Sequence, residues 1–156
     1  MSIDEVKLLA ETECRYPLVK NAFMFSCFCG LRISDIRKLR WSQIETYTED
    51  GEEKYRLTIR MTKTKKNITY QLSKEAIKWL PVKGEDDVIF KGLVQHSCLC
   101  YTIKDWVEAA GIKKKITFHC ARHTFATMML TLGADIYTTS KLLGHTDTAT
   151  PEINSK

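Results

Sequence analysis

Apolar positions near the start of the chain recur at intervals of three and four residues, the spacing of helices that bury one face. Ser2 and Glu5 stand three residues apart just before the apolar Val6, as in a capping box at a helix N-terminus. Pro17 suits the first turn of a second helix, and Gly30 suits its end. The pattern therefore predicts helices over residues 2–13, 17–29 and 33–39.

The middle of the chain changes to a period of two, which is typical of β-strands. Leu57, Ile59 and Met61 are apolar and alternate with polar residues. Turn-forming residues stand at 49–51, and a lysine-rich turn stands at 63–66. The pattern predicts a three-stranded antiparallel meander with a basic tip, with strands over residues 44–48, 55–61 and 67–72.

The second half of the chain returns to helical spacing. In its most helical stretch, the apolar residues that fall on one helix face are Phe118, Ala121, Phe125, Met128, Met129 and Leu132. Proline or glycine closes each predicted helix, and these helices cover residues 73–80, 97–110, 118–132 and 135–143. A loop with a short apolar piece at 88–90 separates the first two. We expect a single domain over residues 1–156, mainly α with a small antiparallel β-sheet (α+β).

Composition narrows the class of protein without identifying it. The 156 residues carry a net charge of +5, which suits a polyanionic partner but does not establish one. No apolar run reaches the roughly 18 residues of a membrane span, and the acidic start lacks the apolar core of a secretion signal. A cytoplasmic protein with no membrane partner is expected.

Six cysteines raise the alternatives of a disulfide framework or a zinc site. Four of them form C-x-C pairs, Cys27 with Cys29 and Cys98 with Cys100. Paired cysteines in zinc sites usually have about two to four residues between them, so neither pair has the expected spacing. We expect reduced cysteines that serve as small buried apolar side chains, and no metal.

A histidine and an arginine stand three residues apart at the predicted start of the helix over 118–132. His119 and Arg122 would project from one face, where the positive end of the helix dipole favours an anion. Alone, this pattern is common by chance, and a solvated pair or a pair at the edge of the core is its simpler explanation.

Four segments together change that interpretation, because they resemble the signature motifs of tyrosine recombinases and occur in the family's order. Residues 116–127 resemble the second signature box, and Leu142-Leu143-Gly144-His145 resembles the L-L-G-H element. Upstream, residues 30–36 (G-L-R-I-S-D-I) resemble the first box, and Thr62-Lys63-Thr64 resembles the lysine motif of the β-hairpin. The resemblance extends over nearly the whole chain.

This resemblance implies the catalytic-domain fold of tyrosine recombinases. Type IB topoisomerases share the chemistry, but the short L-L-G-H spacing is more similar to the integrases of mobile elements. Family members usually carry an N-terminal DNA-clamping domain ahead of the catalytic domain. We expect this sequence to lack that domain.

The resemblance also implies a reaction at DNA phosphodiesters. In this family a tyrosine hydroxyl attacks the phosphorus, forms a 3′-phosphotyrosyl bond and releases a 5′-hydroxyl, without a metal or cofactor. Arg32 and Arg122 would clamp the scissile phosphate, because guanidinium groups bind its oxygens in a bidentate manner. Lys63 would protonate the leaving 5′-oxygen, with Lys65 and Lys66 as competitors for that role.

The remaining site residues follow from the same resemblance. His119 would assist proton transfer near the nucleophile, and His145 would hydrogen-bond the phosphate. Asp35 would orient an arginine instead of touching DNA. His123 is interpreted as structural, on a different helix face from His119, and His96 receives no role.

The chain departs from the family pattern at the nucleophile. The tyrosine is expected nine residues after His145, where this sequence has Asn154. An asparagine amide cannot form the covalent intermediate, so this chain is predicted not to cleave DNA. Pro151 is a further departure, since its ring removes a backbone donor. Tyr137 is interpreted as a packing residue instead of a substitute nucleophile.

The resemblance implies double-stranded DNA as the partner, with homo-oligomers on DNA for full-length proteins and a monomer for this fragment. Lys113, Lys114 and Lys115 would strengthen DNA binding, or would form a solvated face. Two alternatives stay open: a DNA-binding module or regulator that has lost catalysis, and a helical domain unrelated to DNA. The recombinase interpretation predicts that DNA affinity falls steeply with salt, because counterions are released on binding.

Overall fold

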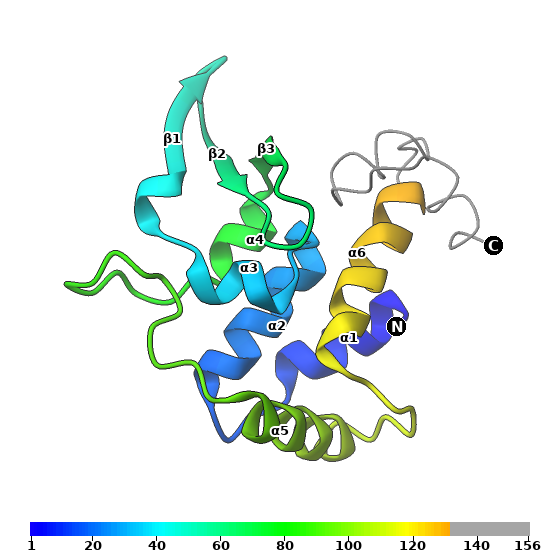
Figure 1. Ribbon diagram of the computed structural model, residues 1–156. Helices are drawn as coiled ribbons and strands as arrows, with labels where there is room; N and C mark the ends of the chain where they lie inside the picture. Colours follow the sequence, from blue (N-terminus) through cyan, green and yellow to red (C-terminus); the bar gives the residue numbers. More distant parts are fainter. Residues whose placement is uncertain (132–156) are drawn as a thin grey trace.

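Six α-helices, one 3-10 turn and three strands make up the described part of the chain, residues 1–131, in this computed structural model. The helices are α1 (Ile3–Glu11), α2 (Pro17–Cys29), α3 (Ile33–Lys38), α4 (Lys74–Lys78), α5 (His96–Ala109) and α6 (Phe118–Thr131). The 3-10 turn η1 (Trp41–Gln43) precedes the strands β1 (Ile44–Glu49), β2 (Glu52–Arg60) and β3 (Asn67–Leu72). Figure 1 shows the helices gathered around α2, with the sheet extending away from them. The predicted fold class, mainly α with a small antiparallel sheet, is confirmed.

Helix α2 lies at the centre of the hydrophobic core because its sequence is apolar on almost every face. Phe23 and Phe25 are fully buried. The Phe23 ring packs edge-on against Trp106 of α5, with ring centroids 5.4 Å apart, and against Phe118 of α6 at 5.8 Å. Full burial of one such side chain contributes about 1.5–3 kcal/mol. These contacts fix α5 and the start of α6 against α2.

The three strands pair in chain order as an antiparallel sheet, as predicted. Glu49 pairs with Glu52, so the first turn has only two residues, Asp50 and Gly51. Both have positive φ angles, 54° and 79°, which suit a hairpin turn that follows the twist of the strands. This tight turn extends the pairing, and β2 therefore begins earlier than the predicted start at residue 55.

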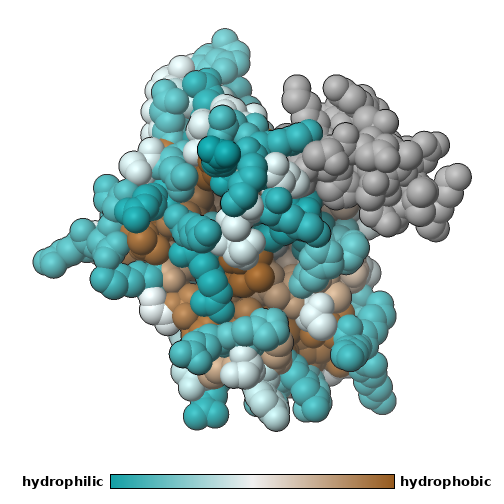
Figure 2. Space-filling model, in the orientation of Figure 1, coloured by the Kyte–Doolittle hydropathy of each residue, from teal (hydrophilic) through white to brown (hydrophobic). Residues whose placement is uncertain are grey.

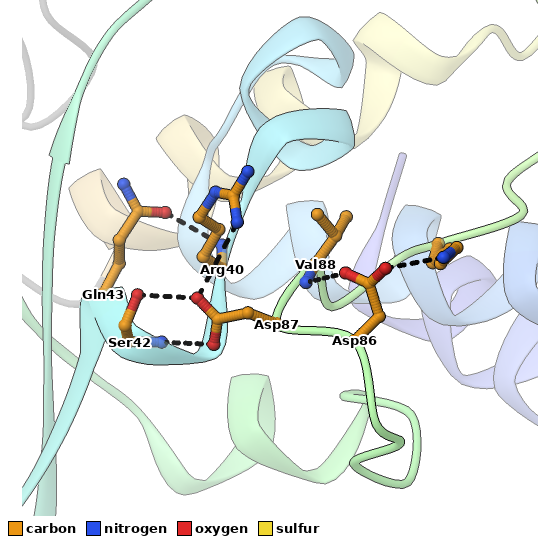
Figure 3. A network of polar contacts seen from close by, with 7 residues as sticks. Arg40, Ser42, Gln43, Asp86, Asp87 and Val88 are labelled. Atoms are coloured by element: carbon orange, nitrogen blue, oxygen red, sulfur yellow. Dashed lines mark hydrogen bonds and ion pairs between the residues drawn. The ribbon is translucent and has the colours of Figure 1, made fainter.

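The loop after α4 is held to the η1 segment by a polar network around Asp87 (Figure 3). The Asp87 carboxylate accepts hydrogen bonds from the Ser42 backbone N–H at 3.2 Å and from the Ser42 hydroxyl at 2.9 Å. It also lies 3.9 Å from the Arg40 guanidinium, and the Trp41 N–H donates to the Asp87 carbonyl at 2.8 Å. These bonds satisfy backbone groups in an irregular segment and anchor the start of β1.

Further features differ from the sequence prediction. Helix α4 is shorter than residues 73–80, because Ser73 is its N-cap, accepting a bond from the Ala76 N–H at 3.1 Å, and the helix ends at Lys78. The turn η1 was not predicted, since three residues give no periodic signal. Met128 and Met129 of α6 are half-buried instead of core residues. The predicted helix over 135–143 and Leu132 lie outside the described residues.

The cysteines divide by position in the fold. Cys14, Cys27 and Cys29 are buried, as predicted, and burial raises the pKa of the Cys29 thiol to about 12. The prediction is wrong for Cys100, which is exposed. Its Sγ lies 3.6 Å from His96 Nε2, one turn earlier on α5. The C-x-C spacing of Cys98 and Cys100 did not reveal that the side of α5 that carries Cys100 faces away from the core.

The face in Figure 2 is hydrophilic over the sheet, and its apolar patches gather over the helices below. Within residues 1–131, no helix has both the length and the apolar character needed to cross a membrane.

Candidate active site

Gly30 allows helix α6 to pass close to the end of α2. Its φ of 76° is left-handed, and its N–H donates to the Ser26 carbonyl at 2.8 Å, which caps α2. A Cβ atom at Gly30 would overlap the ring of Phe125 in α6. Both the left-handed backbone angle and the absence of a side chain at Gly30 are therefore required for the close approach of α6 to α2.

Two arginines that are far apart in sequence meet near this crossing. Arg32 occupies the N-cap position of α3, and Arg122 lies in the second turn of α6 with only 4% of its surface exposed. Burial, and then the positive charge of Arg32, lowers the pKa of Arg122 to about 10. Burial also lowers the pKa of Arg32. Two cationic groups that repel each other in a partly dehydrated place form a natural site for an anion.

One donor of Arg32 indicates where such an anion would bind. Its Nη1 atom is buried and has no hydrogen-bond partner among residues 1–131. A buried donor without a partner costs about 1–3 kcal/mol. A phosphate oxygen would satisfy this donor and would at the same time reduce the repulsion between the two guanidinium groups.

Asp35 connects the first motif to the lysine turn. It is 5% exposed, and its Oδ1 accepts a hydrogen bond from the Thr62 backbone N–H at 2.8 Å. Its negative charge opposes the lowering of the pKa of both Arg32 and Arg122. The expected role of Asp35 in orienting an arginine stays a prediction. The bond to Thr62 adds a second role, which the motif alone did not reveal.

Lys63 stands on the turn between β2 and β3, with its side chain exposed. The Met61 N–H donates to the Lys66 carbonyl at 2.8 Å, and the Lys65 N–H donates to the Met61 carbonyl at 2.9 Å. Lys65 itself has a positive φ of 60°. The positive charge of Lys63 contributes to lowering the pKa of His119, so this turn lies within electrostatic reach of α6. Lys65 and Lys66 are exposed on the same turn.

His119 lies in the first turn of α6 and is exposed. Partial burial lowers its pKa, followed by the effects of His123, Arg122, Arg32 and Lys63. A lowered pKa keeps the imidazole neutral near neutral pH, where it can accept a proton.

His123 is in direct contact with His119. The two rings meet edge to face, with centroids 4.6 Å apart and an interplanar angle of 88°. The prediction that the two histidines occupy different helix faces is therefore wrong. Residues four apart on a helix are surface neighbours, because four residues make slightly more than one turn.

Tyr70 is a half-buried neighbour of the arginine site that sequence reasoning missed. Its hydroxyl donates to the Cys29 carbonyl at 2.7 Å, and burial raises its pKa well above the usual range. Tyr70 and Arg122 influence each other electrostatically. The alternation of β3 could have revealed it, since Tyr70 lies on the same strand face as the buried Ile68 and Leu72.

The other predicted site residues are not part of this cluster. Lys113, Lys114 and Lys115 are exposed in the loop between α5 and α6, and Lys114 Nζ forms an ion pair with Glu5 Oε1 at 2.9 Å. They line a groove of about 710 Å³ that none of the cluster residues borders. His145 and Asn154 lie outside the described residues.

Comparison with known proteins agrees with these motifs. The model of the phage integrase family matches residues 2–153. The tyrosine recombinase XerD of Listeria innocua is 30% identical over 170 aligned positions, which cover 98% of this chain and 56% of that protein. XerD of Pseudomonas aeruginosa is 31% identical over 168 positions, covering 96% and 54%. The chain thus spans about half the length of these relatives.

Solved structures share the fold. The XerA recombinase has a TM-score of 0.76 at 24% identity, covering 100% of this chain and 58% of that one. The catalytic domain of bacteriophage HP1 integrase has a TM-score of 0.72 at 24% identity, covering 99% and 85%. A lambda integrase dimer bound to a COC′ core site has a TM-score of 0.74 at 18% identity, covering 100% and 58%. At these identities the likeness establishes a common fold.

Proposed function

The chain belongs to the phage integrase family of tyrosine recombinases, and from this premise we propose that residues 1–156 form the catalytic domain of a site-specific recombinase acting on double-stranded DNA. One observation carries the proposal. Arg32 and Arg122, from two separate motifs, meet around Asp35 at the α2–α6 crossing. The extensive overlap with the HP1 integrase catalytic domain supports the proposed domain extent.

The two arginines would bind the nonbridging oxygens of the scissile phosphate. The transition state of phosphoryl transfer carries negative charge on these oxygens, and donors already in place stabilise it without reorganisation. The buried Nη1 of Arg32 offers such a donor. Removal of one preorganised donor typically raises a barrier by about 2.7–4 kcal/mol. His145 would add a further hydrogen bond to the phosphate.

Proton transfers would be divided between His119 and Lys63. In the family reaction, the tyrosine oxygen forms a bond to phosphorus while the bond from phosphorus to the 5′-oxygen breaks. His119, kept neutral by its surroundings, would accept the tyrosine proton. Lys63 would donate a proton to the departing 5′-oxygen, and the Asp35–Thr62 hydrogen bond would hold its turn beside the arginines.

Asn154 stands where the attacking tyrosine is expected. We therefore propose that this chain binds the phosphate but does not cleave DNA, because an asparagine amide cannot form the phosphotyrosyl bond. Asn154 also favours a second candidate function, a DNA-binding module or regulator without catalysis. The retention of Arg32, Lys63, His119 and Arg122 argues against long decay of the site.

DNA contacts beyond the reacting phosphate would come from exposed lysines. Those in the turn and in the α5–α6 loop are Lys65, Lys66, Lys113, Lys114 and Lys115. The solved lambda integrase is a dimer on a core site and a tetramer on a Holliday junction. By this likeness, homo-oligomers on DNA are proposed for the full-length protein, and a monomer is proposed for residues 1–156 alone.

Vanadate, a mimic of the phosphoryl transition state, tests the site without knowledge of the DNA target. Titration of the chain followed by NMR should give saturable shifts at Arg32, His119 and Arg122. The variant Arg32→Gln should lose them. The control Arg56→Gln, which removes a guanidinium held by Glu45 and Tyr47 in the sheet, should retain them. Diffuse shifts, unaffected by Arg32→Gln, would argue against an assembled phosphate site.

The variant Asn154→Tyr tests the proposed loss of the nucleophile. On a nicked cognate site, it should become covalently attached to DNA, whereas the parent chain should not. Failure of the variant on a verified site would contradict the placement of residue 154 as the nucleophile and would favour the regulator.

A further inference from the structure

The first two turns of α6 carry a pair of imidazole rings in contact with each other. His119 and His123 are four residues apart, and their ring centroids lie 4.6 Å apart in an edge-to-face arrangement. Both residues are exposed. The ring of His123 lies against one side of the His119 ring, and both rings stay accessible to solvent.

We propose that His123 is a positioning residue, which fixes the ring orientation of His119 and opposes its protonation. The inference rests on the proposed role of His119 as the group that accepts the proton of the nucleophile. An imidazole can accept a proton only in its neutral form, with its free nitrogen directed at the donor. Ring contact with His123 restricts the orientation, and charge on His123 disfavours a second cation beside it.

The other charged groups that face His119 differ from His123 in one respect. Among residues 1–131 they are Arg122 on the same helix, Arg32 at the start of α3 and Lys63 on the β2–β3 turn. Asp35 faces the two arginines and partly offsets their charge. Arginine and lysine stay charged through the neutral range, whereas a histidine changes its charge there. Within this set, His123 is the group that makes the environment of His119 depend on pH.

The pair should titrate as a coupled unit. Two imidazolium ions in contact repel each other, so the first proton taken up by the pair disfavours the second. Charge on the pair therefore opposes protonation of His119, and we expect its neutral, proton-accepting form to persist to lower pH than it would without His123.

Histidine Cε1 proton NMR over a pH series of the full chain tests the inference. The variant His123→Phe retains an aromatic ring in contact with His119 but removes its charge. It should move the titration midpoint of His119 upward by at least about 0.3 pH units. The variant His123→Gln removes the ring as well. It should give the same rise and also displace the His119 resonance at high pH, where both rings are neutral.

The variant His96→Phe is the matched control, because it removes an exposed imidazole from α5. It should leave the His119 midpoint in place. An unchanged midpoint in His123→Phe, or an equal rise in His96→Phe, would overturn the inference. Vanadate titration of the same samples separates this failure from failure of the proposed function. Shifts at Arg32 and Arg122 that persist in His123→Phe would show that the phosphate site stands although the inference fails.

Discussion

The α2–α6 crossing and the β2–β3 turn both supply groups to the candidate site, but they hold those groups differently. At the crossing, Arg122 is buried, and Gly30 and Phe125 leave no space between the helices. At the turn, Lys63 is exposed, and the hydrogen bond from the Thr62 N–H to Asp35 connects the turn to α3.

A buried, fixed group and an exposed group on a turn suit two different chemical roles. A charge clamp is most effective when its donors are fixed in advance, because no reorganisation is needed as charge develops. A proton donor must reach the leaving oxygen of a large substrate, which an exposed lysine on a turn can do. The comparison predicts that damage to the crossing affects folding and anion binding together, whereas damage at the turn leaves both largely intact.

The largest effect is expected for Gly30→Ala. Strain at the left-handed φ costs about 1–2 kcal/mol, and overpacking against Phe125 adds about 1–3 kcal/mol. We expect a loss of about 3 kcal/mol in the free energy of unfolding, measured by urea denaturation. Gly51→Ala is the control, since its φ is 79° but nothing lies within 4 Å of the added carbon. Equal losses in the two variants would show that the crossing is not tightly packed.

Substitution of Arg32 should have the next largest effect, on anion binding. Arg32→Gln should weaken vanadate affinity about 10- to 100-fold, since hydrogen bonds to charged groups contribute about 1.5–3 kcal/mol. Lys63→Gln should weaken it less than about threefold, because an exposed, flexible charge contributes little to binding. Calorimetry or NMR titration measures both. If Lys63→Gln is as damaging as Arg32→Gln, then the turn belongs to the clamp and the comparison fails.

Asp35→Ala should remove the hydrogen bond that connects the β2–β3 turn to α3, with a smaller loss of stability than Gly30→Ala. It leaves the Thr62 N–H without its acceptor, so we expect a loss of about 1–2 kcal/mol in stability and faster hydrogen exchange at the Thr62 amide. Asp35→Asn keeps an acceptor oxygen and removes only the charge. It should therefore retain slow exchange at Thr62. Fast exchange in both variants would assign the effect to charge instead of the hydrogen bond.

The smallest expected effect on stability concerns the ion pair of Lys114 with Glu5. Lys63, by contrast, forms no ion pair within residues 1–131. The Ser2 backbone N–H and Lys114 lower the pKa of Glu5 to about 2. Because the folded pKa lies below the usual value of 4.5, the stabilisation is complete above pH 4.5 and is lost as the pH falls toward 2. At this surface position it amounts to less than about 1 kcal/mol.

The variant Glu5→Gln should remove this acid-dependent part of the stability and lower stability slightly at neutral pH. Urea denaturation between pH 2 and pH 6, a range of roughly four pH units around the titration of carboxylates, measures it. Glu75→Gln is a control, since its ion pair with Lys78 is exposed on both sides. An identical pH profile for Glu5→Gln and the parent chain would contradict the assignment.

Much of this arrangement could be predicted from local patterns. The capping box at Ser2 and the two-residue turn at Gly51 depend on neighbours along the chain, so their signals are local. The motif residues Arg32, His119 and Arg122 were found because each motif is a short continuous segment. The misplacement of His123 was an error of helical geometry, since residues four apart lie on one face.

Contacts between distant segments could not be predicted in the same way. No feature near Gly30 indicates that the ring opposite it is Phe125. Nothing near Asp35 indicates that its carboxylate binds the backbone of Thr62. Such pairs depend on how helices and strands pack, and many packings satisfy the same apolar pattern.

By itself, the sequence determined the types of the main elements and, through the resemblance of its motifs to those of tyrosine recombinases, the family. The elements follow from residue types and spacings along the chain, whereas Asn154 at the expected tyrosine position is what the resemblance implies. Only the tertiary structure decided that Arg32 and Arg122 share a partly dehydrated site, that Asp35 connects them to the lysine turn, and that the ring of His123 lies against that of His119. The physical reason is that pKa values, unsatisfied donors and ring contacts arise from neighbours in space, which chain order does not specify.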